Sequence, residues 1–266
     1  MKIKCPAKIN LFLNVLGIRD SMHELLLINQ TINLYDEIEL IITNNNSIVI
    51  ESNDNIPLDH TNSIYKAAKL FRETYNISDG FKFIVKKNIP IESGLGGEST
   101  DAAGTLILLN EYYKLNISKK ELAKLGIKIG SDVPYFIYSG YMEVTSIGDI
   151  VKTPTINNPY KWYILITPDF GLNTGEMFKK IDNYEFKKVP IKLPYNDFMK
   201  VVPVSIIDIK DYLDSNNISN HTLSGSGSSY YIALEKRNIF LYKKIKEYYN
   251  NYKVILVKNS YNFMIY

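Results

Sequence analysis

Apolar and polar positions alternate at the start of this chain with a period of two, which is typical of half-buried β-strands. The alternation runs from about residue 3 to residue 16, where only Pro6 interrupts it. After a turn-like stretch it continues in two segments that meet around Tyr35 and Asp36. An asparagine-rich turn and another short apolar run follow. The pattern predicts four strands, the first of them broken at its proline.

Helical spacing begins at residue 62 and extends to about residue 75. Its apolar residues Ile64, Ala67, Ala68 and Phe71 would share one face of a helix. A strand, a glycine-rich loop and a second helix follow.

A third helix opens on Ser118, and Glu121 three residues later completes a capping-box pattern. A tight turn at residues 130–134 leads into a short apolar stretch and a strand at about residues 141–148. The proline-bearing segment at residues 152–159 comes next, and we expect a domain boundary there.

The second half of the chain again mixes strands and helices. The predicted elements are strands within residues 161–169, 221–234 and 253–260, and helices within residues 173–182, 196–215 (one or two) and 238–252. Runs of strands followed by helices in both halves predict an α+β fold with antiparallel sheets.

Composition and charge limit the classes of function. With 45% hydrophobic and 22% charged residues, the 266-residue chain has the make-up of an ordinary globular protein. Its net charge of +3 is too small to favour a nucleic-acid partner. Cys5 is the only cysteine and the three histidines lie far apart, so no disulfide and no thiolate or histidine metal cluster is expected. We expect a cytoplasmic protein without a membrane partner, because no apolar run reaches the ~18 residues of a span. The oligomeric state stays open.

The strongest candidate chemistry lies at residues 90–103, PIESGLGGESTDAA, between a predicted strand and a predicted helix. Glycines let the backbone approach an anion closely, and the first N–H groups of the following helix are free to bind phosphate. Ser99 and Thr100 add hydroxyls for phosphate or Mg²⁺. The stretch fits neither the Walker A loop nor the full dinucleotide-binding fingerprint. From these residues alone, a plain glycine turn before a capped helix is an equally good interpretation.

Three more polar features each allow two interpretations. Lys8 and Asn10 lie inside the opening strand, either on the exposed face of an edge strand or buried beside a negative partner. Asp132 lies on the turn at residues 130–134, where an aspartate usually makes a local hydrogen bond. Residues 224–229, SGSGSS, form a second small-residue loop that alone could be a hairpin corner. Together they supply the parts of a phosphoryl-transfer site: a phosphate cradle, a lysine, and a carboxylate for the accepting hydroxyl.

Four segments together resemble, in order and spacing, the signatures of the GHMP kinases. They are residues 6–25, 90–110, 130–140 and 223–234. The resemblance implies a two-domain α+β fold with antiparallel sheets and an active-site cleft between the domains. Residues 1–155 would form an N-terminal ATP-binding domain, and residues 156–266 a C-terminal domain that contributes to the substrate site.

Within the family, the likeness is greatest to kinases that phosphorylate the 2-hydroxyl of 4-diphosphocytidyl-2-C-methyl-D-erythritol, using ATP and Mg²⁺, in non-mevalonate isoprenoid precursor synthesis. The resemblance implies that Lys8 and Asp132 are the catalytic pair. Asp132 would orient or deprotonate the hydroxyl, while Lys8 would keep Asp132 ionised and steady the γ-phosphate.

The resemblance also implies which residues hold ATP. Asn62 and Lys87 would line the adenine pocket, while Gly225 and Gly227 would let the last loop close over the phosphates. The full set is Asn62, Lys87, Pro90, Ile91, Glu92, Ser93, Gly94, Leu95, Gly96, Gly97, Glu98, Ser99, Thr100, Asp101, Gly225 and Gly227.

Two pairs within this set carry further expectations. Ser99 or Thr100 would help to hold Mg²⁺. Glu92 and Glu98 stand where the family usually has glycine, and we expect both to point into solvent or toward Mg²⁺, since a carboxylate facing a triphosphate would repel it.

The substrate, a small molecule carrying cytidine diphosphate, would contact five residues. By resemblance, His23 would read the cytosine edge and Phe178 would stack on the ring. Met22 replaces the aromatic residue that the family usually has beside the histidine. Asn10 and Thr174 would lie near the substrate.

Two alternatives share the same scaffold. One is a kinase of another small alcohol, such as homoserine, mevalonate or a sugar. The other is a non-catalytic ATP- or RNA-binding module. The presence of both Lys8 and Asp132, and the lack of a basic patch, argue against the second alternative.

Overall fold

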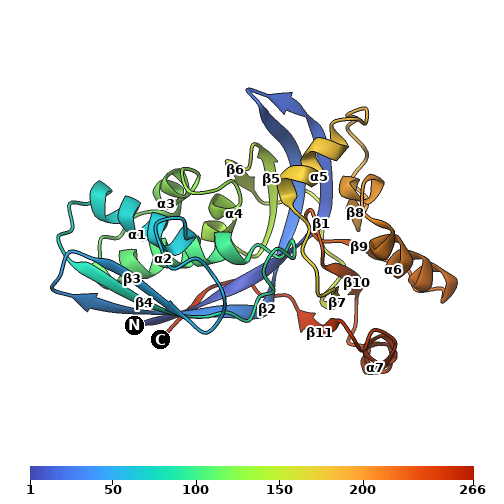
Figure 1. The fold of residues 1–266 in the computed structure, drawn as a ribbon. Helices are drawn as coiled ribbons and strands as arrows, with labels where there is room; N and C mark the ends of the chain where they lie inside the picture. The colour runs from blue at the N-terminus through green and yellow to red at the C-terminus, as the bar shows by residue number, and fades with distance from the viewer.

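The computed structural model describes residues 1–266 and arranges the chain around two β-sheets (Figure 1). The larger sheet has eight strands and the smaller one has four. Seven α-helices accompany them, four with the larger sheet and three with the second half of the chain. Both termini lie close together at the edge of the larger sheet (Figure 1).

The larger sheet draws six of its eight strands from residues 1–155. Its strands are β1 (Lys2–Arg19), β2 (Met22–Thr43), β3 (Ile48–Ser52), β4 (Gly80–Lys86), β5 (Tyr141–Ser146), β6 (Ile150–Lys152), β8 (Tyr195–Asn196) and β12 (Met264–Ile265). The central order is β12-β1-β2-β4-β3, with β5 and β6 continuing from β2 and with β8 beside β1. Because β1 has partners on both sides, it is an interior strand, and most of its residues are buried.

β1 and β2 form one long antiparallel hairpin, without the breaks that the sequence predicted in each. Pro6 pairs with Tyr35, whereas the next residue, Ala7, pairs with Ile32. Two residues of β2 therefore bulge outward between these pairs. A bulge relaxes the hydrogen-bond ladder locally, so a proline without an N–H is accommodated there and the strand continues.

Four helices lie over one face of the larger sheet (Figure 1). They are α1 (Ser63–Thr74), α2 (Gly97–Tyr113), α3 (Lys119–Gly126) and α4 (Val133–Tyr138). α1 buries its predicted apolar face, and α3 begins with the predicted capping box. The apolar stretch after the turn at residues 130–134 forms α4, with Pro134 in its first turn, where a missing N–H has little cost.

The smaller sheet is antiparallel throughout and comes entirely from the second half of the chain. Its order is β11-β7-β10-β9. The elements of this half are β7 (Trp162–Thr167), α5 (Thr174–Ile181), a 3₁₀ turn η1 (Asp197–Lys200), α6 (Val204–Ser215), β9 (His221–Leu223), β10 (Tyr230–Leu234), α7 (Ile239–Tyr248) and β11 (Lys253–Lys258).

The two sheets share an apolar core. One cluster of 15 buried residues places Ile9 and Phe12 of β1 together with Leu165 of β7 and Tyr231 of β10.

The predicted α+β fold with antiparallel sheets is confirmed, with β3–β4 and β1–β8 as the parallel pairs. The domain boundary after residue 155 stays a prediction, and β8 and β12 join the larger sheet from beyond it. None of the helices combines the length and the apolar character that crossing a bilayer demands.

Asp197 ties η1 to β1 through a dense set of contacts. Its carboxylate accepts hydrogen bonds from the Val15 N–H at 2.8 Å and the Asn14 amide at 2.7 Å. It also accepts one from the Tyr195 hydroxyl at 2.6 Å and pairs with Lys200 at 2.7 Å. Burial raises the pKa of this carboxyl, but the donors outweigh burial and hold the pKa below its ordinary value.

We predict that Asp197→Asn lowers the free energy of unfolding by about 2 kcal/mol at pH 7. Because the folded-state pKa lies below the ordinary value of 3.8, the stabilisation is complete above that pH and is lost as the pH falls through the folded-state pKa. Urea unfolding curves of the two proteins should therefore differ at pH 7 and converge on acidification. Equal unfolding free energies at pH 7 would contradict the prediction.

Candidate active site

A cavity of about 510 Å³ lies where β1, the glycine-rich loop, the starts of α1 and α2, the turn before α4, and the second half of the chain meet. Most of the residues that the sequence singled out line it. These are Lys8, Asn10, Asn62, Lys87, Pro90, Ile91, Glu92, Ser93, Gly94, Gly96, Gly97, Glu98, Ser99, Asp101, Asp132, Thr174, Phe178 and Gly225. Met22, His23, Leu95, Thr100 and Gly227 lie outside this lining.

Lys8 lies buried within β1, and its ammonium is 3.8 Å from a carboxylate oxygen of Asp132. The ammonium also donates a hydrogen bond to Asn10, whose amide in turn donates to Asn29 at 2.7 Å. Burial lowers the pKa of Lys8, while the negative charge of Asp132 opposes this shift. The interpretation of Lys8 as a surface residue of an edge strand is therefore wrong.

Asp132 immediately precedes α4, but its side chain makes no capping hydrogen bond to that helix. The carboxylate faces Lys8 across the cavity instead, and about a third of the side chain (32%) remains exposed. The usual role of a turn aspartate, a local hydrogen bond to the backbone, does not apply here. This carboxylate is both charge-paired and open to a ligand.

The glycine-rich loop lies directly over Lys8. The Lys8 backbone N–H donates to the Leu95 carbonyl at 2.9 Å. Gly96 has a φ of +75°, and a Cβ there would meet the Phe136 ring at 2.7 Å and the Lys8 side chain at 3.2 Å. A side chain at this position would therefore push the loop away from the buried lysine.

The second small-residue loop packs against the first through backbone contacts. The Ser229 N–H donates to the Ser93 carbonyl, and the Ser224 hydroxyl donates to the Gly94 carbonyl, both at 3.0 Å. A Cβ at Gly94, whose φ is +75°, would lie 2.0 Å from the Ser224 carbonyl oxygen. The loop at residues 224–229 joins the antiparallel strands β9 and β10, so it is a hairpin corner as predicted, and its residues Gly225 and Ser226 also line the cavity.

The start of α2 supplies backbone N–H groups that have no partner within the helix. Ser99 in this first turn lines the cavity, whereas Thr100 is fully buried, lies outside the lining and leaves its hydroxyl without a hydrogen-bond partner. Glu92 and Glu98 both line the cavity and are both exposed. Exposure to solvent was one of the two arrangements expected for these carboxylates.

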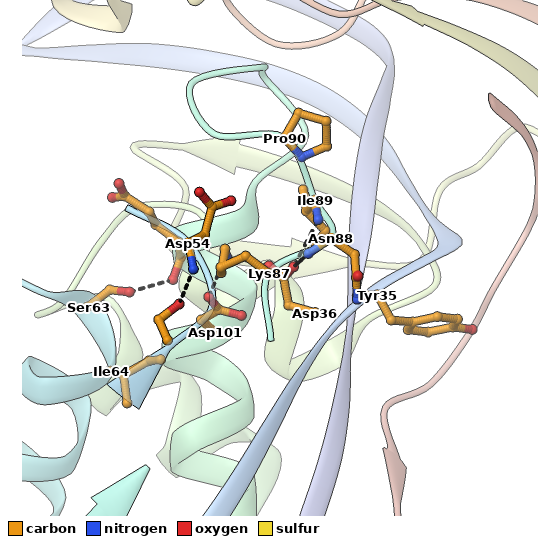
Figure 2. Close-up of polar contacts among 12 residues, drawn as sticks. Tyr35, Asp36, Asp54, Ser63, Ile64, Lys87, Asn88, Ile89, Pro90 and Asp101 are labelled. Carbon is orange, nitrogen blue, oxygen red and sulfur yellow. Dashed lines mark hydrogen bonds and ion pairs between the residues drawn. The ribbon is translucent and has the colours of Figure 1, made fainter. Parts of the chain in front are cut away.

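Lys87 is held between two buried carboxylates, Asp36 from β2 and Asp101 from α2 (Figure 2). Burial alone would lower the pKa of Lys87, but the two ion pairs overcome this and raise it. Burial raises the pKa of Asp101 to about 7 against the opposing effect of Lys87. The sequence analysis missed Asp36, although an aspartate between apolar strand positions was a visible signal.

At the far end of the β1–β2 hairpin, His23 stacks on Phe178 with ring centroids 4.2 Å apart. The His23 Nε2 lies 2.7 Å from a carboxylate oxygen of Asp182, a residue that the sequence analysis did not single out. Phe178 lines the cavity, whereas His23 contacts the Phe178 ring without lining the cavity itself. Met22 is exposed beside the turn of the hairpin.

Thr174, at the start of α5, reaches the small-residue loop. Its hydroxyl lies 2.8 Å from the Ser226 hydroxyl, and both residues line the cavity. Asn62 caps α1 through a hydrogen bond from the Ile64 N–H and also faces the cavity.

The geometry can be compared with known proteins. Residues 62–140 match the family described as GHMP kinases N terminal domain. A protein named 4-diphosphocytidyl-2-C-methyl-D-erythritol kinase from Clostridium tetani is 48% identical over 193 residues, which are 71% of this chain and 68% of that protein. The chain belongs to the GHMP kinase family. A kinase of the same name from Clostridium perfringens is 37% identical to this GHMP kinase over 230 residues, 84% of this chain and 78% of that protein.

Solved structures of GHMP kinases share the fold. A 4-(cytidine 5'-diphospho)-2C-methyl-D-erythritol kinase matches 98% of this chain and 100% of its own, with a TM-score of 0.77 and 22% identity. A homoserine kinase from Cytophaga hutchinsonii matches 100% of this chain and 97% of its own, with a TM-score of 0.75 and 16% identity. Kinases of different alcohols thus have similar folds, so fold alone does not identify the acceptor.

We predict that Gly94→Ala destabilises this GHMP kinase by at least ~2 kcal/mol, because a positive φ is costly for an L-residue and the new methyl group forces the two loops apart. Gly17→Ala is the matched control, since nothing lies within 4 Å of a Cβ built there. Urea unfolding would measure both variants. Similar unfolding free energies for the two variants would contradict the close contact between the loops.

Proposed function

We propose that this GHMP kinase transfers the γ-phosphoryl group of ATP to the 2-hydroxyl of 4-diphosphocytidyl-2-C-methyl-D-erythritol. The observation that carries the proposal is the pairing of buried Lys8 with partly exposed Asp132 beneath two packed glycine loops. The names of relatives at 37% and 48% identity support this acceptor. Residues 1–155 would bind ATP, and residues 156–266 would contribute to the acceptor site.

The reaction would use each part of the cavity. The acceptor hydroxyl oxygen attacks the γ-phosphorus, the bond from that phosphorus to the β,γ-bridging oxygen breaks, and ADP leaves. Asp132 orients the hydroxyl or takes its proton. Lys8 balances the charge of Asp132 and of the transferring group. The backbone N–H groups at the start of α2, with the helix dipole, would stabilise the phosphates.

The same cavity fits ATP accompanied by Mg²⁺. This ion usually keeps several waters and takes one or two protein oxygens together with substrate phosphates. Ser99 and Glu98 both line the cavity, whereas Thr100 does not. We therefore assign Ser99 as the hydroxyl for the ion. When bound, Mg²⁺ would supply further neutralisation of phosphate charge.

Phe178 and His23 are the residues that we assign to the cytidine group. Phe178 lines the cavity, and His23 stacks against it. The contact with Asp182 fixes the orientation of the His23 ring. Asn10, which accepts a hydrogen bond from the Lys8 ammonium, and Thr174 both line the cavity, and we assign them to the alcohol portion of the substrate.

A coupled assay of ADP release tests the function. We expect turnover with 4-diphosphocytidyl-2-C-methyl-D-erythritol and none above background with homoserine or mevalonate. Solved structures named homoserine kinase and mevalonate kinase have the same fold. The two alcohols are therefore matched controls for the choice of acceptor. Turnover of homoserine or mevalonate in place of the cytidine compound would overturn the assignment of the acceptor.

Asp132→Ala should lower kcat at least ~100-fold, because the variant lacks the carboxylate that orients or deprotonates the hydroxyl. Steady-state kinetics at saturating ATP and acceptor would measure the change. Thermal unfolding of the variant is the control for intact folding. A kcat close to that of the wild type would remove Asp132 from the mechanism.

A further inference from the structure

A buried ion cluster, separate from the catalytic pair, joins the two ends of the glycine-rich loop (Figure 2). Lys87 lies just before the loop, at the end of β4, and Asp101 lies just after it, in the second turn of α2. The Lys87 ammonium is 2.7 Å from Asp101 and in direct contact with Asp36 of β2. One lysine therefore connects the entrance and the exit of the loop to the sheet.

Asp36 holds the loop entrance through a second set of contacts. One of its carboxylate oxygens faces Lys87, while the other accepts hydrogen bonds from the Asn88 N–H at 2.6 Å and the Ile89 N–H at 2.9 Å. Three consecutive residues leading into the loop are thus bound to one side chain. The Asn88 amide adds a hydrogen bond of 2.7 Å to the Tyr35 carbonyl, next to Asp36.

The start of α2 rests directly on this cluster. A Cβ built at Gly97, the first residue of the helix, would lie 3.4 Å from the Lys87 ammonium and 3.6 Å from an Asp36 carboxylate oxygen. These distances are ordinary van der Waals contacts, so the first residue of the helix packs against the charged groups. The cluster therefore fixes both the loop entrance and the helix N-terminus, the two ends between which a phosphate chain would bind.

The charges of the cluster are shielded from water. The side chains of Lys87 and Asp101 are 4% exposed and that of Asp36 is fully buried. The Lys87 ammonium already contacts two carboxyl groups, so Lys87 is not a free cation for a phosphate. Asp36 uses both of its oxygens, whereas one oxygen of Asp101 has no partner. Asp36 is thus the firmer anchor of the two.

We propose that Asp36 is a positioning residue for ATP binding, which holds the loop entrance directly and the start of α2 through Lys87 and Asp101. The proposal rests on the function proposed above, because it takes the glycine-rich loop as the cradle of ATP. Asp36 itself touches no substrate: it lies outside the cavity lining, behind Lys87. Its effect should therefore fall on the affinity for ATP and leave the chemical step nearly unchanged.

Asp36→Asn tests this role, because the amide keeps the size of the side chain and one oxygen for the two backbone N–H groups but removes the charge that faces Lys87. We expect KM for ATP to rise about tenfold, with kcat and the KM of the acceptor within about threefold of wild type. Calorimetric titration with ATP alone should show the same loss of affinity. Since calorimetry needs no acceptor, a wrong assignment of the acceptor would not affect this result.

Asp197→Asn is the matched control, because Asp197 is also a buried aspartate that pairs with a lysine and accepts a backbone N–H. Both variants should have lower melting temperatures, but only Asp36→Asn should bind ATP more weakly. An unchanged ATP affinity in Asp36→Asn despite a lower melting temperature would reduce Asp36 to a structural role. An equal loss of ATP affinity in both variants would also overturn the proposal.

A double variant tests the path of the effect. If Asp36 acts through Lys87, then Asp36→Asn combined with Lys87→Met should bind ATP no more weakly than Lys87→Met alone. If the loss of ATP affinity in the double variant equalled the product of the losses in the two single variants, this path would be contradicted. Circular dichroism of each variant would establish that it is folded before its affinity is compared.

Discussion

The burial of the Lys8 ammonium is the constraint on which the active site depends. A lysine inside an interior strand is costly unless a negative partner lies nearby. Its partner, Asp132, comes from a turn far away in the sequence, so the fold must bring the start of α4 against β1. Both glycine loops then close over the same ammonium: a Cβ at Gly225 would lie 3.3 Å from it, and a Cβ at Gly96 would meet the lysine stem. The buried ammonium, its carboxylate partner and both glycine loops, to which we assign the catalytic charge and the phosphate cradle, thus share one location.

The contact between the two glycine loops explains why the cavity forms where the halves of the chain meet. The first loop belongs to the larger sheet and its helices, whereas the loop at residues 224–229 connects two strands of the smaller sheet. Backbone atoms meet where Gly94 faces Ser224, which leaves no room for a side chain at residue 94. The shared apolar core beneath them keeps the sheets at a fixed separation. A ligand in the cavity would therefore touch both halves at once.

Sequence patterns predicted those parts of the structure that depend on local spacing. The apolar face of α1 and the capping box of α3 follow from helix periodicity, and both are present. The bulge opposite Pro6 and the short helix α4 were not predicted, because pairing between strands and packing against the sheet decide them. The roles of Asp36 and Asp182 were missed for a related reason. Each acquires its partner only through tertiary structure, so a polar residue at an apolar strand position, such as Asp36, does not reveal which groups it will bind.

Three aspartates that pair with lysines around this site and β1 differ in their burial and in their free hydrogen-bonding capacity. Around Asp36 and around Asp197, backbone N–H groups and lysines satisfy the carboxylates, and both side chains are almost fully buried. Such groups hold neighbouring segments in place and have no free capacity for a substrate. At Asp132 the ammonium is 3.8 Å away, too far for a hydrogen bond, and the side chain is 32% exposed. Its oxygens retain capacity to accept a hydrogen bond from an alcohol. Of the three, only this carboxylate combines a stabilising charge with access to a ligand, and for that reason we assign the reaction to it.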